Sequence, residues 1–325
     1  MPEQLTYREA INRALRDAMR RDPAVVALGE DIGRAGGSFK VTEGLFEEFG
    51  GERVMDTPIS ETGFVGAAIG LALGGLRPVV ELMFADFDAV AYDQIVNQAA
   101  KYLYLSAGQM PVPMVIRTVG GAGLGFASQH SQTTESWYLA IPGLKVVVPS
   151  DPQSAYGLLL SAIEDPNPVV YIEHKKLYNR KGIVDTSVPI PIGTSAILRA
   201  GADVTIVASL AMVVEALEAA EALATQGIAA EVIDLRTLVP MELDTILASV
   251  VRTGRLVVVE EQPLAGGWGG HVVAEVVSRA FDSLDHPPLR VAMDHVPVPF
   301  SQALEAQTVP TAERVAAATA SMFGG

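Results

Sequence analysis

Apolar residues at helical spacing open the chain. Ile11, Leu15 and Met19 lie four residues apart, and Thr6 and Glu9 stand just before them. A threonine followed three residues later by a glutamate is typical of a capping box, and the apolar spacing places its members on one helix face. The pattern predicts an amphipathic helix that begins near Thr6.

The next apolar runs are short and continuous, which indicates buried strands. In the first half of the chain they occupy 25–28, 54–55, 79–83, 114–116, 145–148 and 169–173. Helical patterns separate several of them: one follows residue 61, one spans about 87–104, and Ser150 and Gln153 would cap a third. Strands that alternate with helices favour a parallel, doubly wound sheet.

The alternation stops between about 178 and 199, where prolines and a glycine interrupt it. It then restarts with predicted strands and helices in turn, at 204–208, 212–224, 231–234, 243–251 and 256–259. A glycine-rich segment at 266–270 precedes another predicted helix. The predicted fold class is therefore α/β with two doubly wound domains, 1–185 and 201–325, joined by a linker at 186–200.

The composition narrows the class of protein. The 325 residues are 49% hydrophobic and 19% charged, which is typical of a globular chain long enough for two ordinary cores. A net charge of −15 without any lysine or arginine run argues against nucleic-acid binding, and no apolar segment approaches the roughly twenty residues that span a bilayer. Because the chain has no cysteine and no secretory signal pattern, we predict a soluble cytoplasmic protein without thiolate chemistry.

A lone carboxylate stands at the start of the helix that follows the second strand. Glu61 precedes Gly66, Gly70 and Gly74, which recur at four-residue spacing. Such glycines leave a smooth helix face that another backbone can approach closely. Glu61 is either a first-turn acid favoured by the helix dipole or a catalytic carboxylate, and the residues alone favour the first interpretation.

A histidine among polar side chains is a second candidate for chemistry. The alternating glycines of 120–125 match neither a dinucleotide fingerprint nor a phosphate loop, so we expect a mobile loop there. Gln129, His130, Ser131 and Gln132 follow it, an arrangement that can place an imidazole for proton transfer. No other histidine has metal-ligand spacing and no Gly-x-Ser-x-Gly elbow occurs, which argues against a zinc site and a serine hydrolase.

A set of ordered motifs resembles one protein family. The motifs occupy 29–31, 41–45, 56–64, 93–101, 129–132, 142–145 and 234–238. Over nearly its whole length the chain resembles the β subunit of the E1 component of thiamine-diphosphate-dependent 2-oxo acid and acetoin dehydrogenase complexes. The resemblance implies that the first domain is the pyrimidine-binding domain of a transketolase-like fold and that the second is its carboxy-terminal domain.

The resemblance assigns roles to three residues. Glu61 would hydrogen-bond the N1′ atom of the cofactor's aminopyrimidine, and to donate there it must be protonated, which requires desolvation by neighbours such as Phe64 and Phe87. Phe87 would lie against the aminopyrimidine, although an ordinary core phenylalanine fits the sequence equally well. His130 would transfer protons and orient the reacting groups during acyl transfer to lipoamide.

Some relatives hold a structural potassium ion in a loop between a helix and a strand. The residues that resemble this site are Met114, Ala162, Ile163, Asp165 and Asn167. An ordinary helix-to-strand turn is the alternative interpretation, and we favour it over K⁺ binding.

Two departures from the family pattern leave the substrate open. Ala140 stands where many relatives have histidine, and Val90 stands where some have a polar residue near the cofactor. Pyruvate is the favoured substrate. Acetoin comes next, because Arg117 and Thr118 resemble acetoin dehydrogenases, and a branched-chain 2-oxo acid is third.

The Gly-Asp-Gly motif that holds diphosphate and Mg²⁺ in such enzymes does not occur in this chain. The resemblance therefore implies half an active site, with thiamine diphosphate shared with an E1 α subunit that binds the Mg²⁺ in an α2β2 heterotetramer. The acidic chain would also dock the E2 lipoyl acyltransferase core through charge complementarity. Two rival functions are a split transketolase-like carboligase, which ignores lipoamide, and a non-catalytic scaffold.

Overall fold

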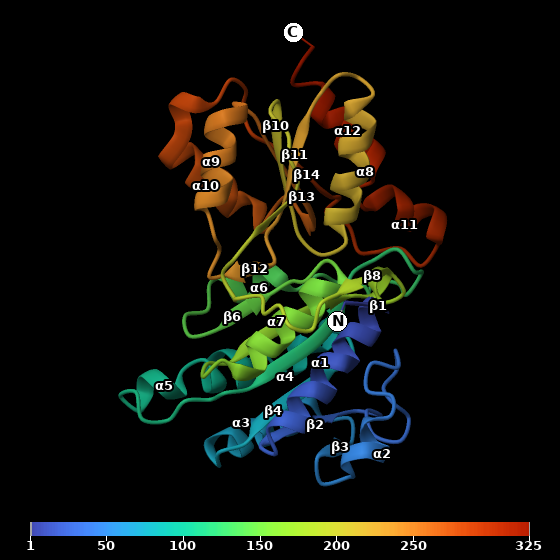
Figure 1. Cartoon of the computed structure of the whole chain (residues 1–325), viewed down its shortest axis with the longest axis vertical. Coiled ribbons are helices and arrows are strands. Elements are labelled where there is room, and N and C mark those ends of the chain that lie inside the picture. The colour runs from blue at the N-terminus through green and yellow to red at the C-terminus, as the bar shows by residue number, and fades with distance from the viewer. Residues whose placement is uncertain (1, 325) are drawn as a thin grey trace.

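The structure is a computed structural model that describes residues 2–324 of the chain. Two sheets form the centres of the lower and upper halves of the molecule in Figure 1, with helices packed around each. The lower sheet has seven strands and the upper sheet five, and a two-stranded sheet pairs β1 (Glu3–Thr6) with β8 (Lys181–Val184). The predicted α/β class is confirmed.

The lower sheet has the strand order β12-β6-β7-β5-β4-β2-β3. Its strands are β2 (Val25–Gly29), β3 (Val54–Asp56), β4 (Arg77–Leu82), β5 (Val115–Gly120), β6 (Lys145–Val147), β7 (Val169–His174) and β12 (Thr237–Val239). Neighbouring strands are parallel, except that β12 runs antiparallel to β6. Strands β2, β5 and β7 are buried along their whole length, as expected for a parallel sheet covered on both faces.

Helices cover both faces of the lower sheet. They are α1 (Tyr7–Arg21), α2 (Leu45–Phe49), α3 (Glu61–Leu73), α4 (Asp88–Asp93), α5 (Tyr102–Leu105), α6 (Glu135–Leu139) and α7 (Pro152–Glu164). Helices α1 and α7 pack together in the same core as Ala27, whereas α3 and α4 share a second core with Leu28. Because successive strand residues point to opposite faces, these neighbours lie in different cores, as a doubly wound sheet requires.

Helix α1 begins where the sequence predicts. The Thr6 hydroxyl accepts from the Glu9 backbone N–H at 3.3 Å, and the Glu9 carboxylate accepts from the Thr6 N–H at 2.7 Å. Ile11, Leu15 and Met19 are each at most 1% exposed. The capping box and the apolar face are both confirmed.

The cap of α7 differs from the prediction by one residue. Asp151 caps this helix and accepts from the Ser154 N–H at 2.9 Å, whereas Ser150 and Gln153 were the predicted pair. The Ser154 hydroxyl in turn accepts from the Asp151 N–H at 3.1 Å. Pro152 explains the shift, because its fixed φ suits the first helical position and so places the cap immediately before it.

The helix predicted at 87–104 is a series of short segments. A 3-10 turn, η1 (Ala85–Phe87), leads into α4, and a π-helical segment, η2 (Gln94–Ala99), separates α4 from α5. The Ala100 N–H donates to the Ile95 carbonyl at 3.1 Å, five residues back, which marks the wider π turn. Apolar spacing alone does not distinguish an α-helix from a 3-10 turn or a π-helix. The division of this helix into short segments could therefore not be predicted.

The upper sheet has the strand order β14-β13-β10-β11-β9. Its strands are β9 (Ala196–Arg199), β10 (Val204–Ala208), β11 (Ala230–Asp234), β13 (Leu256–Pro263) and β14 (Leu289–Met293). Its helices are α8 (Met212–Ala224), α9 (Asp244–Thr253), α10 (Gly269–Ala280), α11 (Gln302–Thr308) and α12 (Ala312–Ala320). Strand β9 lies inside the segment 186–200 that was predicted as a linker, and it pairs antiparallel with β11. Strand β9 is four residues long, and its apolar residues Ile197 and Leu198 are exposed.

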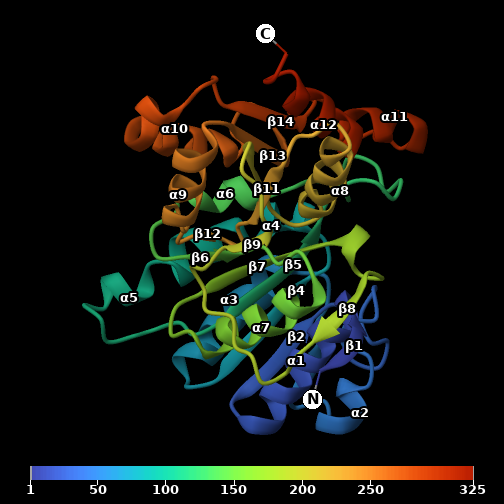
Figure 2. The ribbon, with the colours of Figure 1, turned by 45° about the horizontal axis from the view of Figure 1, so that its top comes forward.

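One strand connects the two halves of the molecule, because it comes from the upper half and joins the lower sheet. The chain of the upper half descends to place β12 beside β6, where Thr237 pairs with Val147, so the upper half supplies the edge strand of the lower sheet. Figure 2 shows β12 and β6 side by side below α9. The sequence motif at 234–238, noted for its family resemblance, is the segment that makes this connection.

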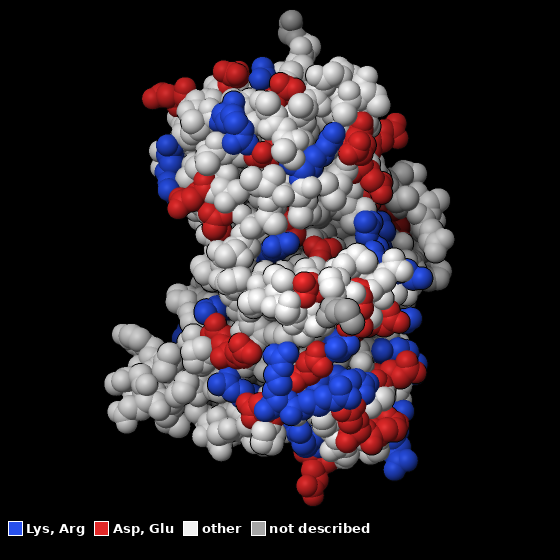
Figure 3. Space-filling view, viewed as in Figure 1, with Lys and Arg blue, Asp and Glu red and all other residues white. Residues whose placement is uncertain are grey.

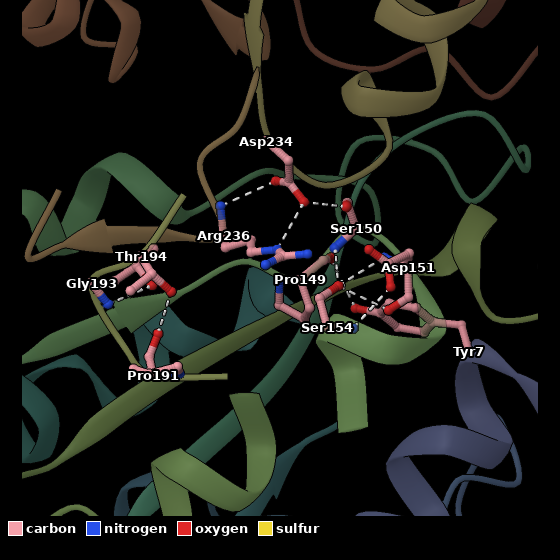
Figure 4. A network of polar contacts seen from close by, with 11 residues as sticks. Tyr7, Pro149, Ser150, Asp151, Ser154, Pro191, Gly193, Thr194, Asp234 and Arg236 are labelled. Atoms are coloured by element: carbon pink, nitrogen blue, oxygen red, sulfur yellow. Dashed lines mark hydrogen bonds and ion pairs between the residues drawn. The ribbon is translucent and has the colours of Figure 1, made fainter. Parts of the chain in front are cut away.

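A buried polar cluster fixes the same joint. Figure 4 shows Asp234, at the end of β11, between Ser150 and Arg236. The Ser150 hydroxyl and the Arg236 backbone N–H both donate to the Asp234 carboxylate, and the Tyr7 hydroxyl donates to the Pro149 carbonyl at 3.2 Å. Burial raises the pKa of Asp234 to about 7, although these donors oppose the shift.

Charges of both signs are mixed on the face drawn in Figure 3. Arginines of α1 pair with acids, for example Arg20 with Glu48 at 2.6 Å and Arg13 with Asp17 at 2.9 Å. The net negative charge is therefore not concentrated as one acidic field on this face. Within residues 2–324, no helix is both long enough and apolar enough to span a bilayer.

Candidate active site

The candidate site residues follow parallel strands of the lower sheet. Because these strands run in the same direction, their carboxyl ends meet at one edge, where ligand sites of doubly wound folds occur. Glu30 follows β2, Phe84 and Phe87 follow β4, His130 lies on the loop after β5, and Lys175 follows β7. Glu61 reaches this edge as the first residue of α3, after β3.

Glu61 has an acidic neighbour that the sequence reasoning did not single out. Both Glu61 and Glu30 are 7% exposed, and one Glu30 oxygen, Oε1, is buried without a hydrogen-bond partner among the described residues. Burial raises the pKa of Glu30, and the charge of Glu61 raises it further. Both effects disfavour the ionised form of the Glu30 carboxyl. The sequence feature that could have identified Glu30 is its position directly after a buried strand.

The structure brings His130 and Phe87 together. Their ring centroids lie 5.5 Å apart at an interplanar angle of 80°, an edge-to-face contact. Phe84 makes a closer contact of the same kind, with centroids 4.6 Å apart at 82°. Phe87 is half-buried and Phe84 is buried, so the imidazole of His130 is oriented by two aromatic rings from one short segment. The sequence reasoning named Phe87 but missed Phe84.

Two aspartates from the same segment hold the chain that follows His130. The Asp86 carboxylate accepts from both the backbone N–H and the side-chain amide of Gln132, at 3.3 and 2.9 Å. Asp88 accepts from the Thr134 hydroxyl at 2.9 Å and is 0% exposed. Burial raises the pKa of Asp88 to about 7, despite the Thr134 hydroxyl that donates to it. Residues 84–88 thus contact both the imidazole and the backbone beyond it.

The glycine loop at 120–125, which we expected to be mobile, is bound by acids of the upper half. The Ala122 N–H donates to Glu261 at 2.6 Å, and the N–H groups of Gly123 and Gly125 donate to the two oxygens of Glu305 at 2.7 and 2.9 Å. Successive backbone N–H groups form an anion-binding concavity, and here carboxylates of the same chain fill it. The loop is therefore anchored to the upper half just before His130.

Glu261 also pairs with a histidine at the end of β7. His174 Nε2 lies 2.7 Å from the Glu261 carboxylate, and both side chains are buried. Burial alone would raise the pKa of Glu261, but His174 outweighs it and the pKa is lowered. This buried contact links β7 of the lower sheet to β13 of the upper sheet.

The residues that resemble a potassium site lie near the amino-terminal ends of β5 and β7, opposite the end where His130 lies. Asp165 pairs with the Lys145 ammonium, and the Ile163 carbonyl accepts from Arg77 at 2.8 Å. The Met114 carbonyl accepts from a backbone N–H of β7, and Asn167 donates to Asp165. Two of the five residues thus contact basic side chains of the protein, and K⁺ binding by this loop stays a prediction. The described residues also contain no cluster of three or more histidines and acids suited to a metal.

The three positions that bear on the substrate, Arg117, Val90 and Ala140, lie on different elements. Arg117 is 2% exposed and its guanidinium is held by Glu173 at 2.7 Å and Glu81 at 2.6 Å. Val90 is 52% exposed on α4, and Ala140 lies at the end of α6. Arg117 is therefore buried between acids of the neighbouring strands β4 and β7.

A cavity of about 480 Å³ opens between the two halves beside the His130 loop. Its lining includes Gln132, Ser136 and Trp137 from the lower half and Gln262 and Val298 from the upper half. The Gln262 amide donates to Glu135 at 2.6 Å, which closes one wall. The lining thus combines amide and hydroxyl groups with apolar side chains, a combination typical of sites for small ligands.

Comparison with known families agrees with this architecture. Residues 3–181 match the transketolase pyrimidine binding domain, and residues 193–315 match the transketolase C-terminal domain. A solved structure, described as the inactive β4 tetramer of a split-gene transketolase, has a TM-score of 0.80 and 29% identity, with 98% of each chain covered. The fold and its family matches define a two-domain protein of the transketolase-like class.

Curated relatives specify the class further. The chain is 47% identical over 336 residues to the β subunit of acetoin:2,6-dichlorophenolindophenol oxidoreductase of Cupriavidus necator, covering 100% of this chain and 99% of the relative. It is 46% identical over 318 residues to subunit β-2 of the mitochondrial pyruvate dehydrogenase E1 component of Oryza sativa subsp. japonica, covering 96% and 85%. The chain belongs to the family of E1 β subunits of pyruvate and acetoin dehydrogenase complexes. This family depends on thiamine diphosphate, and its β subunits pair with an α subunit.

Proposed function

We propose that the chain, active only with its α subunit, acts in oxidative decarboxylation of pyruvate and transfers the acetyl group to lipoamide on an E2 acyltransferase. The observation that carries this proposal is the contact of Phe87 with His130 at the edge of the sheet where Glu61 and Glu30 are both buried. Thiamine diphosphate, when bound, supplies the carbanion chemistry that cleaves the bond next to the carbonyl.

The residues of this chain fit the aminopyrimidine half of that cofactor. Glu61 is buried as the first residue of α3 and would contact the ring nitrogen, and one buried oxygen of Glu30 has no hydrogen-bond partner among the described residues. Phe87 offers a half-buried ring face, and His130 can move a proton at the reacting carbonyl or at the lipoyl sulfur. The α subunit would hold the diphosphate and Mg²⁺, because the chain has no Gly-Asp-Gly motif.

We further propose an α2β2 heterotetramer. The open glycine side of α3 supports this assembly: Gly70 is exposed, and a β-carbon built there would meet no atom within 4 Å. A second backbone can therefore approach this helix closely.

The test is reconstitution with the natural α subunit, thiamine diphosphate and Mg²⁺. Pyruvate is expected to give both CO₂ release and acetylated lipoyl domain, and the assembly is expected to have the mass of a heterotetramer, whereas the chain alone is expected to be inactive. A branched-chain 2-oxo acid in place of pyruvate checks the third substrate. Ketol transfer without lipoyl acetylation would instead indicate the transketolase-like carboligase. The absence of turnover with every acceptor would indicate the non-catalytic scaffold.

Acetoin is the second candidate substrate. It is favoured by the full-length match to the acetoin oxidoreductase β subunit, of which 99% is covered. Acetoin-dependent reduction of 2,6-dichlorophenolindophenol by the same assembly, without CO₂ release, would establish it in place of pyruvate.

A further inference from the structure

Lys175 is a buried lysine with an unusual set of partners. It is the first residue after β7 and is only 3% exposed. Its ammonium donates to the backbone carbonyl of His130, and it lies over the rings of Phe84 and Phe126, 5.6 and 5.7 Å from their centroids. A buried ammonium is costly unless it is partnered, so these contacts define where the side chain must lie.

The contacts of Lys175 converge on one imidazole. Lys175 binds the His130 carbonyl directly, and it also lies over Phe84, whose ring makes the 4.6 Å edge contact with the His130 ring. Movement of this one side chain would therefore change both the backbone and the ring environment of His130. The side chains of the segment 84–88 do not hold the His130 carbonyl in this way, because they contact the ring and the residues beyond it.

We infer that Lys175 is a positioning residue, which holds the loop of His130 so that the imidazole is aimed for proton transfer during acyl transfer to the lipoyl group. The inference rests on the proposed function. It extends that function to a residue that does not itself contact the reacting atoms.

The charges around Lys175 make this role depend on pH. Burial lowers the pKa of Lys175 to about 8, while Asp86 on η1, Glu261 on β13 and Glu305 on α11 oppose the shift. His130 is the titratable group beyond the bound carbonyl. As pH rises through about 8 the ammonium loses its charge, and a neutral amine is a weaker donor and no longer makes a cation–π contact. The His130 loop is therefore expected to loosen between about pH 7 and pH 9.

The experiment compares Lys175→Met, Lys175→Arg and the control Lys181→Met, an exposed lysine on β8, in the assembled E1 enzyme. Lipoyl acetylation by Lys175→Met is expected to fall roughly tenfold to a hundredfold in kcat, with the KM for pyruvate little changed. Wild type and the control are expected to lose acetylation activity above about pH 8, whereas Lys175→Arg stays charged and keeps activity at that pH. Wild-type acetylation rates in Lys175→Met, or an unchanged alkaline decline in Lys175→Arg, would overturn the inference.

A second readout does not depend on turnover. In the chain labelled with ¹³C-histidine, the ring signal of His130 is assigned among the five histidines by comparison with His130→Asn. This signal is expected to show an inflection near pH 8 in wild type that disappears in both Lys175 variants. An assembly without turnover would contradict the proposed function, while the titration would still test Lys175. A His130 signal that is the same in wild type and Lys175→Met would sink the inference even in an active enzyme.

Discussion

Glu61 and Glu30 show how burial changes the meaning of an acid at the start of a helix. Glu61 is the first residue of α3, where the helix dipole favours an ionised carboxylate. Glu30 stands beside it with an unpartnered buried oxygen and a raised pKa, which favours retention of a proton. A dipole-compensating acid alone would need no such neighbour. The catalytic role of Glu61 stays a prediction, which substitution can test.

The first prediction concerns Glu61→Gln in the assembled enzyme. An amide cannot relay a proton to a ring nitrogen, so pyruvate turnover is expected to fall roughly a hundredfold or more. Steady-state CO₂ release measures this, and thermal unfolding checks the fold. Glu47→Gln, at an exposed acid on α2, is the matched control. Full activity of the Glu61 variant would make Glu61 a helix-dipole acid after all.

The second prediction uses the pH dependence of stability. The pKa of Asp88 is raised to about 7, so the folded state binds its proton more tightly than the unfolded chain does. Its stabilising contribution is complete at low pH and is lost as pH rises to about 7. Asp88→Asn removes this loss while an amide oxygen still accepts from Thr134, so at pH 8 the variant is expected to be more stable by roughly 2–4 kcal/mol.

Urea unfolding of wild type and Asp88→Asn at pH 5 and pH 8 measures the difference. Asp282→Asn, an exposed site, controls for the loss of one negative charge. If the stability advantage of Asp88→Asn were the same at both pH values, the titration of Asp88 would not be its cause.

Among the elements, strands and helices with a strong apolar pattern were predicted and those without one were not. The four-residue spacing of apolar residues in α1 predicts a helix, and the continuous apolar run of β2 predicts a buried strand. Strand β12 is only three residues long and pairs with a strand from the other half of the molecule, so no local pattern marks it. The π turn of η2 preserves apolar spacing while it changes the hydrogen bonding, and this too leaves no sequence signal.

The candidate site divides in the same way. Glu61, Phe87 and His130 were named from ordered motifs, and the structure places the rings of Phe87 and His130 in contact. The acids that anchor the glycine loop before His130 were missed. Glu305, for example, comes about 180 residues after this loop in the chain. A single sequence carries no information about such long-range pairs. Lys175 was missed for a similar reason, since a lysine after a strand is usually exposed.

The third prediction tests the anchor of the glycine loop on α11. Glu305→Ala leaves the N–H groups of Gly123 and Gly125 without their acceptor, a loss of roughly 1–3 kcal/mol per charge-assisted bond. Amide exchange in the segment 120–130 is expected to rise at least roughly tenfold, as measured by hydrogen–deuterium exchange with mass spectrometry. The exposed Glu313 on α12 gives the control variant Glu313→Ala. Unchanged exchange would mean that other contacts hold the loop.

At the scale of the whole molecule, the joint between the halves is polar and buried. Asp234 is 0% exposed and depends on the Ser150 hydroxyl, which donates to it across the joint. The joint thus relies on hydrogen bonds whose loss leaves a buried acceptor unsatisfied, which costs more than the bond itself contributes.

The fourth prediction follows from this dependence. Ser150→Ala is expected to lower the free energy of unfolding by roughly 1–3 kcal/mol, because one oxygen of Asp234 loses its donor. Denaturant unfolding measures the loss. Ser301→Ala is the control, since Ser301 is exposed and its side chain makes no cap bond to α11. A loss no greater than that of the control would show that Arg236 satisfies Asp234 alone.

Strand β12 has a practical consequence for anyone who wishes to recombine this protein. The edge of the lower sheet is closed by residues that come 90 positions after β6 in the chain, at Thr237 against Val147. A chimaera that takes only residues 1–185 from this chain would leave β6 with an open edge and the glycine loop without Glu261 and Glu305. Strand β12 and these two acids must therefore be exchanged together with the lower half. The segment that a working chimaera takes from this chain is thus larger than either domain.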